Sequence, residues 1–118
     1  MNQAQIIMDY IESEYKNKAE YLFIDSDTAV FRKGERKKWY AVVMTISRRK
    51  LGIDSDEMVE VLNVKLNPNE IALLIDKVAY FPAYHMNKKH WCTIPLDDTL
   101  DTDEICFRVN ESYSLVKG

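Results

Sequence analysis

The chain has 118 residues, of which 47% are hydrophobic and 30% charged, with three glycines and three prolines. This length predicts a single domain, residues 1–118, and the near-average composition excludes a largely disordered chain. The net charge of −3 argues against a generally basic nucleic-acid binder, and no apolar run approaches the ~20 residues that a membrane helix needs. Two cysteines cannot form a disulfide framework and the sequence has no secretory pattern, so we expect a cytoplasmic protein without membrane contact.

Three segments carry a capping residue followed three positions later by Gln or Glu, the pattern of a helix start. The pairs are Asn2 with Gln5, Asn67 with Glu70, and Asp101 with Glu104. We expect helices from these starts to about Lys18, Val78 and Val116. Apolar spacing predicts their inward faces: Ile6, Ile7, Tyr10, Ile11 and Tyr15; Ile71, Leu74, Ile75 and Val78; and Ile105, Val109, Ser112, Tyr113 and Val116.

The segments between these helices are rich in residues that favour strands. Residues 20–25 and 28–33 predict a hairpin around Ser26–Asp27, and 38–46 and 58–66 predict two longer strands, with 48–57 as a loop. In the strand predicted at 58–66, one face is expected to carry Met58, Leu62, Val64 and Leu66. Residues 91–96 predict a final strand, in which Pro95 favours an edge position or a strand end. The order predicts the α+β class: two layers, an antiparallel sheet and three helices, as α-β(4)-α-β(1–2)-α.

The charges are unevenly distributed along the chain. Residues 32–50 carry a net charge of +7, because Glu35 is their only acidic residue, whereas the other 99 residues carry −10. One interpretation is a solvated hairpin turn with charged strand ends. The other is a positive surface for an anionic partner.

Residues 81–91 hold two His, two Lys, an Asn and several aromatic residues, and four interpretations compete. His85 and His90 are metal-ligating types, but no known ligand spacing accompanies them. His90 as a base, with Cys92 as a nucleophile, would suit catalysis, although a buried inert thiol is the commoner state of a cysteine. We therefore expect no enzyme activity, no metal and no cofactor.

The other two interpretations are recognition and structure. Lys88, Lys89, His90 and Trp91 suit phosphate contacts and base stacking. In the structural interpretation, Asn87 caps a turn and Trp91 anchors the last strand.

The string His85-Met86-Asn87-Lys88-Lys89-His90-Trp91-Cys92-Thr93, followed by Leu96-Asp97, resembles the signature of MmcQ/YjbR-like proteins. The strings Ala29-Val30-Phe31-Arg32, Lys38-Trp39-Tyr40, Leu62-Asn63-Val64-Lys65 and Glu111-Ser112-Tyr113 are similar to the family's strands and closing helix. The resemblance covers residues 20 to 115. It implies a small bacterial single-domain protein with a two-layer frataxin-like (CyaY-like) fold. It also implies DNA binding, because the family's fold is likened to a double-wing DNA-binding domain.

These observations lead to a non-enzymatic, DNA-binding interpretation in which a basic hairpin and strand end contact phosphates. The residues expected there are Arg32, Lys33, Arg36, Lys37, Lys38, Arg48, Arg49, Lys50, Lys88 and Lys89. The alternative is a protein- or small-molecule-binding module that uses a groove. Its expected residues are Tyr84, His85, Asn87, Lys88, His90 and Trp91. We expect a monomer, or a weak dimer formed through an exposed strand edge at Trp91–Leu96.

Overall fold

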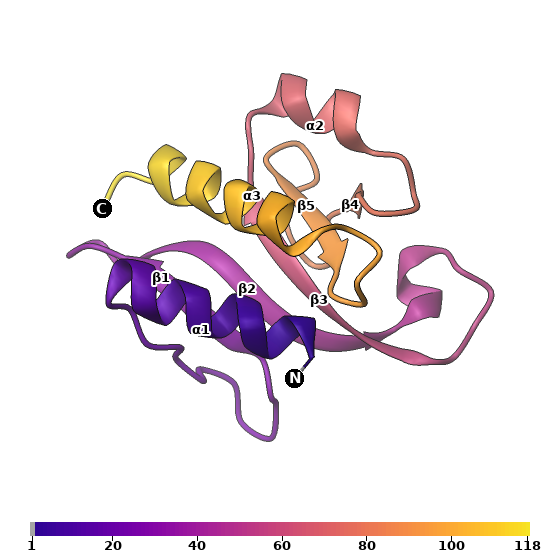
Figure 1. The fold of residues 1–118 in the computed structure, drawn as a ribbon, viewed down its shortest axis with the longest axis horizontal. Helices are drawn as coiled ribbons and strands as arrows, with labels where there is room; N and C mark the ends of the chain where they lie inside the picture. Colours follow the sequence, from indigo (N-terminus) through magenta and orange to yellow (C-terminus); the bar gives the residue numbers. More distant parts are fainter. Residues whose placement is uncertain (1) are drawn as a thin grey trace.

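A computed structural model describes residues 2–118 as an antiparallel five-stranded sheet with two helices packed on one face (Figure 1). The strand order is β1-β2-β3-β5-β4. The helices are α1 (Gln3–Tyr15), α2 (Pro68–Leu74) and α3 (Thr102–Leu115), with a short 3₁₀ helix η1 (Arg48–Leu51). The strands are β1 (Ala29–Lys33), β2 (Lys38–Ser47), β3 (Met58–Lys65), β4 (Phe81–Pro82) and β5 (Trp91–Pro95). The predicted α+β class and antiparallel sheet are confirmed.

The main core lies between the sheet and the two helices α1 and α3. Alternation along the strands turns Phe31, Leu62 and Ile94 towards the helices, which contribute Ile7 and Ile105, and all five are fully buried. The predicted inward residues Ile11 and Val109 are buried as expected. Ile6 and Val78 are exposed instead, and Met58, the first residue of β3, is 60% exposed.

A bulge in β2 determines which side chains reach the other face of the sheet. The pairing of β1 with β2 shifts between Phe31 and Arg32, and Tyr40 and Ala41 both join the helix-side core. Trp39 therefore lies on the opposite face with Val42 and Met44, where the three line one cavity. This opposite face is covered by irregular segments rather than by helices, and a second, smaller cluster forms there around Val61 and Phe81.

Ser112 on α3 completes the backbone pairing next to the bulge. Ala41 pairs with Val64, so Tyr40 and Lys65 are the next positions along β2 and β3. The Ser112 hydroxyl donates to the Tyr40 carbonyl at 2.6 Å and accepts from the Lys65 amide at 2.8 Å. One fully buried hydroxyl thus joins α3 to two strands.

The predicted strand at 20–25 was wrong. Only Glu20 pairs with β1, through two backbone hydrogen bonds with Val30 of 2.9 and 2.8 Å. Beyond it Asp25 adopts a positive φ of 58°, and Ile24 is 92% exposed. The run of consecutive apolar residues has strand propensity but no alternation, so it has no single face to bury.

The predicted helix starts are confirmed, but the ends and caps differ. Asn2 accepts a hydrogen bond from the Gln5 amide at 2.8 Å, as expected, whereas Asp101 makes no side-chain cap bond. The helix predicted to Lys18 ends at Tyr15, because Lys16 is left-handed with a φ of 50°. The helix predicted to Val78 ends at Leu74, because the next residues form a separate turn.

Pro95 ends β5, as predicted for a proline in a strand. β5 itself is not at the edge of the sheet, because β4 pairs with Cys92 and Thr93. The exposed edge predicted at Trp91–Leu96 is therefore occupied at these two residues, and the monomeric or weakly dimeric state stays a prediction. Among residues 2–118, no helix has the length and apolarity to cross a membrane.

Candidate nucleic-acid interface

Two of the predicted phosphate-binding residues on β1 are engaged inside the protein. Arg32 donates to both carboxylate oxygens of Glu20, at 2.8 and 2.6 Å. Hydrogen bonding from this guanidinium holds the pKa of Glu20 below its usual value. The Lys33 ammonium donates to the Tyr113 carbonyl at 2.7 Å and lies 4.1 Å from the centre of that ring. Arg32 is therefore neutralised by an ion pair, and the Lys33 ammonium is held by a carbonyl and a ring.

The β2–β3 connection, residues 48–57, is electrically balanced. Arg48 pairs with Glu57 at 2.6 Å and with Asp97 at 3.1 Å. Arg49 pairs with Asp54 and Asp56, at 3.2 and 2.7 Å. The segment contains three basic and three acidic residues, so its net charge is zero. The positive charge expected at this strand end is therefore neutralised by acidic residues of the same connection.

Asp97 holds one of these arginines from the β5–α3 connection. Partial burial acts to raise the pKa of this carboxyl, but hydrogen bonds from Thr99 and Arg48 outweigh burial and lower it. The ion pair is therefore present at neutral pH, and it joins the β2–β3 connection to the start of the last helix.

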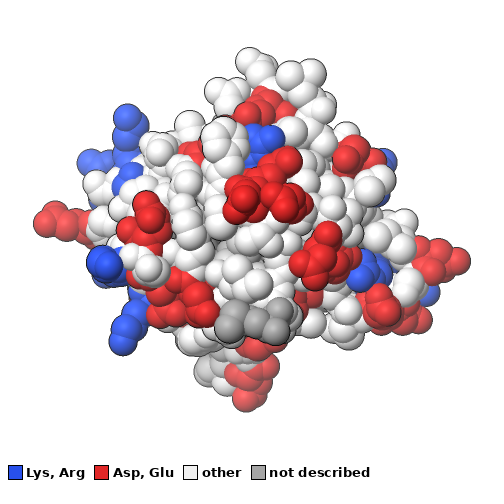
Figure 2. Space-filling view, in the orientation of Figure 1, with Lys and Arg blue, Asp and Glu red and all other residues white. Residues whose placement is uncertain are grey.

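The remaining basic residues gather at the opposite end of β2. Arg36, Lys37 and Lys38 form no ion pair within residues 2–118. A basic cleft of about 260 Å³ opens beside them. Its lining residues are Arg36, Lys38, Trp39, Lys65, Leu115, Val116 and Lys117. None of the described lining residues is acidic. Figure 2 shows several blue residues at the corresponding end of the molecule, with red ones among them.

The β1–β2 turn holds the cleft's basic residues close to the C-terminal segment. Gly34 and Lys37 adopt positive φ angles of 71° and 53°, and the Lys37 amide donates to the Gly34 carbonyl at 3.2 Å. Gly118 packs against this turn so closely that a Cβ on it would lie 2.9 Å from the Gly34 Cα. The turn, the end of β3 and the residues after α3 therefore supply the cleft together.

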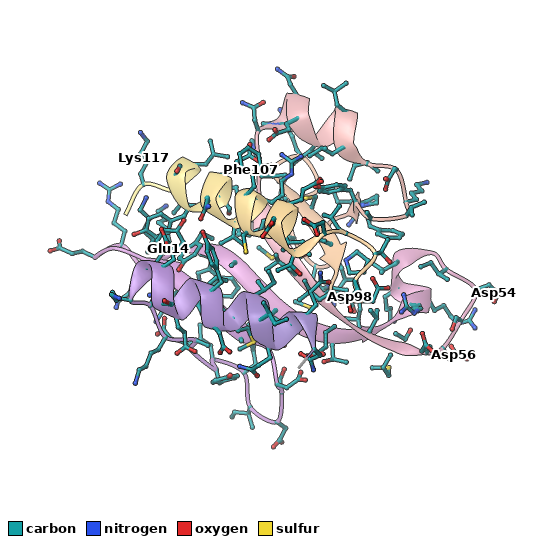
Figure 3. All side chains as sticks on the ribbon, in the orientation of Figure 1. Glu14, Asp54, Asp56, Asp98, Phe107 and Lys117 are labelled. Atoms are coloured by element: carbon teal, nitrogen blue, oxygen red, sulfur yellow. The ribbon has the colours of Figure 1, made fainter. Side chains whose placement is uncertain are left out.

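The two halves of the predicted basic stretch do not form one surface. β2 has ten residues, which at about 3.3 Å per residue separates its ends by roughly 30 Å. Figure 3 shows Lys117 at one end of the molecule and Asp54 and Asp56 at the other. At the turn end, Arg36 and Lys38 meet Lys65 and Lys117 on one concave surface.

The turn at residues 87–90 has a structural explanation. Asn87 accepts through its side chain from the amides of Lys89 and His90, at 2.8 and 3.2 Å. Its backbone carbonyl accepts from the Trp91 amide at 2.9 Å. Asn87 therefore caps the turn that leads into β5, as the structural interpretation predicted.

A closed ring of hydrogen bonds fixes the chain just before this turn. Thr93 donates to the Asn63 side-chain oxygen, Asn63 donates to the Tyr84 carbonyl at 3.1 Å, and the Tyr84 amide donates to Thr93 at 2.9 Å. Asn63 and Thr93 are fully buried, and every buried side-chain polar atom described has a partner. Thr93 and Asn63, which the resemblance also includes, thus anchor the loop.

The predicted groove does not form as one surface. His85, with a φ of 60°, lines an apolar cavity of about 490 Å³ whose other residues include Phe23 and Trp39. Tyr84 and Lys88 line a different cavity, of about 290 Å³. Lys89 and His90 are exposed, and Trp91 is only 9% exposed at the start of β5. The loop therefore separates two cavities instead of building one groove.

The nucleophile and metal interpretations find no supporting geometry in the described residues. Cys92 is fully buried, and burial raises the pKa of its thiol to about 12. Glu104, predicted to complete the start of the last helix, accepts a hydrogen bond from the Tyr80 hydroxyl instead. Within residues 2–118 no group of three or more His, Cys, Asp or Glu side chains converges on a common point.

Sequence reasoning missed Lys65 and Lys117 as members of the basic cleft. Both are single lysines in apolar contexts, far from the basic stretch along the chain. A signal that could have identified Lys65 is its position at the end of a predicted strand. That strand pairs with β2, which begins at Lys38. For Lys117 the sequence holds no comparable signal.

Residues 14–115 match the model of the YjbR family. The chain is 30% identical over 112 residues to the uncharacterized protein YyaQ of Bacillus subtilis (strain 168), which covers 94% of this chain and 95% of that protein. A crystal structure of a Pseudomonas syringae protein is 37% identical, with a TM-score of 0.92, covering 99% of this chain and all of the other. A crystal structure of the Deinococcus radiodurans protein DR2400 is 27% identical, with a TM-score of 0.69, over 93% of this chain and 80% of the other.

Proposed function

The chain belongs to the YjbR family, and we propose that it binds DNA weakly and without sequence preference through the basic cleft at the β1–β2 turn. One observation carries this proposal. Unpaired cations from three separate parts of the chain, Arg36 with Lys38, Lys65 and Lys117, line one concave surface that has no acidic lining residue among those described. A phosphate backbone is the polyanion that such a surface complements.

The cleft contacts phosphates by charge rather than reading bases. Lysines act as point charges for phosphate oxygens, and Arg36 adds a guanidinium that bonds two of them. Trp39 is half-buried in the cleft wall, where a sugar or an unstacked base meets an apolar surface. The net charge of −3 limits affinity, so we expect dissociation constants of about 10⁻⁴ to 10⁻⁶ M at physiological salt and tighter binding at low salt.

The proposal needs no catalytic residue and no cofactor, and it assigns the protein to the cytoplasm, where DNA is accessible in a bacterium. It also revises the set of interface residues. Arg32, Lys33, Arg48 and Arg49 leave it because they are engaged internally. Four further lysines leave it because they do not line the cleft: Lys37, Lys50, Lys88 and Lys89.

The experiment is an anisotropy titration of a labelled random-sequence duplex across a range of salt concentrations. The test variant is Arg36→Gln with Lys38→Gln, both in the cleft, and the control is Arg49→Gln with Lys50→Gln at the far end of β2. Each double variant removes one arginine and one lysine. We expect the first to weaken binding clearly and the second to leave it nearly unchanged.

A small-ligand role at His85 is the second candidate, supported by the apolar cavity of about 490 Å³. Phe23, Trp39 and Met44 line this cavity, and its chemistry suits a neutral apolar molecule. Titration with toluene, followed by the methyl signals of Met44 and Met86, tests it. Saturable shifts at these two methyls, with Met58 unchanged, would support the role; unchanged signals at all three would exclude it.

A further inference from the structure

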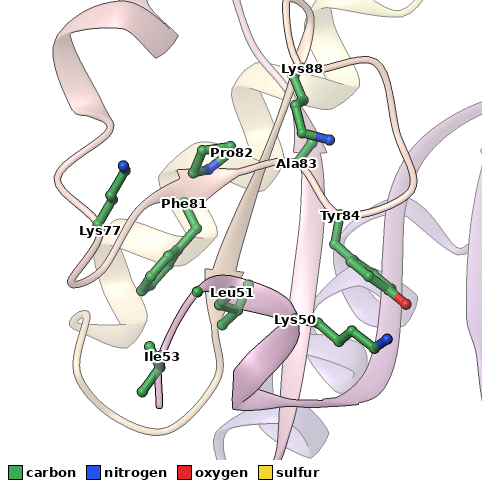
Figure 4. A pocket seen from close by; sticks show the side chains of 10 residues that line it. Lys50, Leu51, Ile53, Lys77, Phe81, Pro82, Ala83, Tyr84 and Lys88 are labelled. Atoms are coloured by element: carbon green, nitrogen blue, oxygen red, sulfur yellow. The ribbon is translucent and has the colours of Figure 1, made fainter. Parts of the chain in front are cut away.

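We propose that the cavity beneath Tyr84, called here the lysine pocket, binds a small organic phosphate monoester with an apolar body. The pocket has a volume of about 290 Å³ and lies between η1, the α2–β4 connection and the β4–β5 connection (Figure 4). Its lining residues are Lys50, Leu51, Gly52, Ile53, Lys77, Phe81, Pro82, Ala83, Tyr84 and Lys88. This site is separate from the basic cleft, and the inference goes beyond the proposed DNA binding.

The charge of the lysine pocket is one-sided. Lys50, Lys77 and Lys88 come from three different segments, and none forms an ion pair within residues 2–118. None of the described lining residues is acidic. Figure 4 shows Lys50, Tyr84 and Lys88 on one side of the cavity and Lys77 on the other, with Leu51 and Phe81 between them. A phosphate dianion in the cavity therefore lies in a positive potential to which all three lysines contribute.

The nearby carboxylates are already engaged. Asp76, next to Lys77, accepts from the backbone amides of Val78, Ala79 and Tyr80 at 2.9, 2.9 and 3.0 Å. The acidic residues that follow η1 pair with Arg48 and Arg49, and Lys50 has no such partner. These carboxylates are therefore bonded to backbone amides or to arginines, and the three lysines of the pocket remain available to a ligand.

The segments that carry the lysines are held in place without a ligand. The Asp76 turn fixes Lys77 at a φ of 59°, and Gly52 ends η1 at a φ of 84° with its amide bonded to the Arg49 carbonyl at 3.0 Å. The Thr93–Asn63–Tyr84 ring holds the third segment. Such fixed backbones lower the entropy lost when a ligand binds.

The apolar floor specifies what accompanies the phosphate. Phe81 is 1% exposed and Leu51 8% exposed, and Ile53 packs on the same cluster. Above this buried floor, Pro82 is exposed and Ile53 and Tyr84 are half-buried. Inorganic phosphate leaves these three wet, whereas an ester with a ring or branched alkyl group covers them. The volume limits the body to a single small group, since drug-sized ligands occupy pockets of roughly 300–1,000 Å³.

The test is a titration with phenyl phosphate, followed by backbone amide shifts in two-dimensional NMR. We expect saturable shifts at residues 50–53, 77–84 and 88, with a dissociation constant on the order of 1 mM. Lys50→Gln, Lys77→Gln and Lys88→Gln each weaken binding about fivefold. Lys89→Gln is the matched control, because Lys89 is exposed beside Lys88 but does not line the pocket, and it keeps the wild-type constant.

Three outcomes would overturn the inference: shifts that do not saturate, equal weakening by Lys89→Gln, or equal affinity for inorganic phosphate. The last would show that the apolar floor is not used. The Arg36→Gln and Lys38→Gln double variant separates the two sites, because it weakens DNA binding if that proposal holds and leaves phenyl phosphate binding unchanged. A failure to observe DNA binding therefore leaves the inference about the lysine pocket standing. A failure to observe phenyl phosphate binding leaves the DNA-binding proposal standing.

Discussion

Single hydroxyl and amide groups decide how the strands and loops of this protein are joined. Ser112 bridges two strands next to the β2 bulge, and Thr93 closes a three-membered ring that reaches Tyr84. Both side chains are fully buried, and their partners have no water to replace a lost bond. The consequence is that small polar residues, rather than the charged ones, are the sensitive positions near the candidate sites.

Replacing Ser112 by alanine is expected to lower the free energy of unfolding by about 1–3 kcal/mol, because the Tyr40 carbonyl and the Lys65 amide lose their partner. Chemical denaturation measures it. Ser114→Ala is the control, since Ser114 lies on the same helix but is exposed. Equal effects of the two substitutions would contradict the bridging role.

Replacing Thr93 by valine keeps the volume but removes the hydroxyl from the ring. We predict a loss of about 1–3 kcal/mol of stability and faster hydrogen exchange at the Tyr84 amide, which donates to Thr93. Thr45→Val removes the exposed hydrogen bond to Asp27 and serves as the control, with a much smaller effect. An unchanged Tyr84 amide would show that the ring does not fix the loop.

At the scale of elements, the sequence predicted starts better than ends. The capping pattern at Asn67 identified α2, but apolar spacing extended it to Val78 because Ile75 and Val78 continue the helical period. The Asp76 carboxylate instead captures three amides and closes a turn, a local competition that periodicity does not register. The strand predicted at 20–25 does not form for another reason. Its residues have strand propensity, but they have no single apolar face that would be buried by joining the sheet.

Replacing Asp76 by alanine tests the turn between α2 and β4. Hydrogen bonds from the Tyr80 and Val78 amides lower the pKa of Asp76, so its stabilisation is present above the usual carboxyl pKa of about 3.9. It is lost as pH falls through the lowered folded-state pKa. We expect the variant to be about 1 kcal/mol less stable at pH 7, and the difference to shrink towards pH 2. A difference independent of pH would contradict this account.

The candidate sites were predictable to different degrees. Arg36, Lys37 and Lys38 lie in the stretch that charge counting selected, and the structure places them at the cleft or beside it. The same counting included Arg48 and Arg49, whose partners follow within ten residues, so local acidic residues were the missed signal. The lysine pocket joins residues from three segments, and only the folded chain brings them together.

On the scale of the whole molecule, one arginine joins the last helix to α2 through ion pairs. Arg108 on α3 pairs with Glu111 at 2.7 Å, with Glu70 on α2 at 3.3 Å, and with Glu104 at 3.7 Å. Burial and the neighbouring Glu111 raise the pKa of Glu70, although Arg108 partly opposes the shift. Removing this cation leaves three acidic residues close together over the core.

We predict that Arg108→Met lowers stability by about 3 kcal/mol at pH 7, because the Arg108 side chain is only 11% exposed and its partners become uncompensated. The loss is expected to be smaller near pH 4, where protonation of Glu70 and its neighbours relieves their repulsion. Thermal denaturation at both pH values measures this. Lys16→Met, which removes an exposed cation outside the ion pairs described, is the control. A larger loss at pH 4 would contradict the network.

The salt dependence of DNA binding tests the central claim most directly. If about four cations of the cleft contact phosphates, the logarithm of the association constant for a random duplex falls with log salt at a slope of roughly −3 to −4. The account predicts that Arg36→Gln with Lys38→Gln lowers this slope by about 2 and that Arg49→Gln with Lys50→Gln leaves it unchanged. The account is contradicted if neither duplex nor single-stranded DNA binds at low salt, or if both double variants change the slope equally.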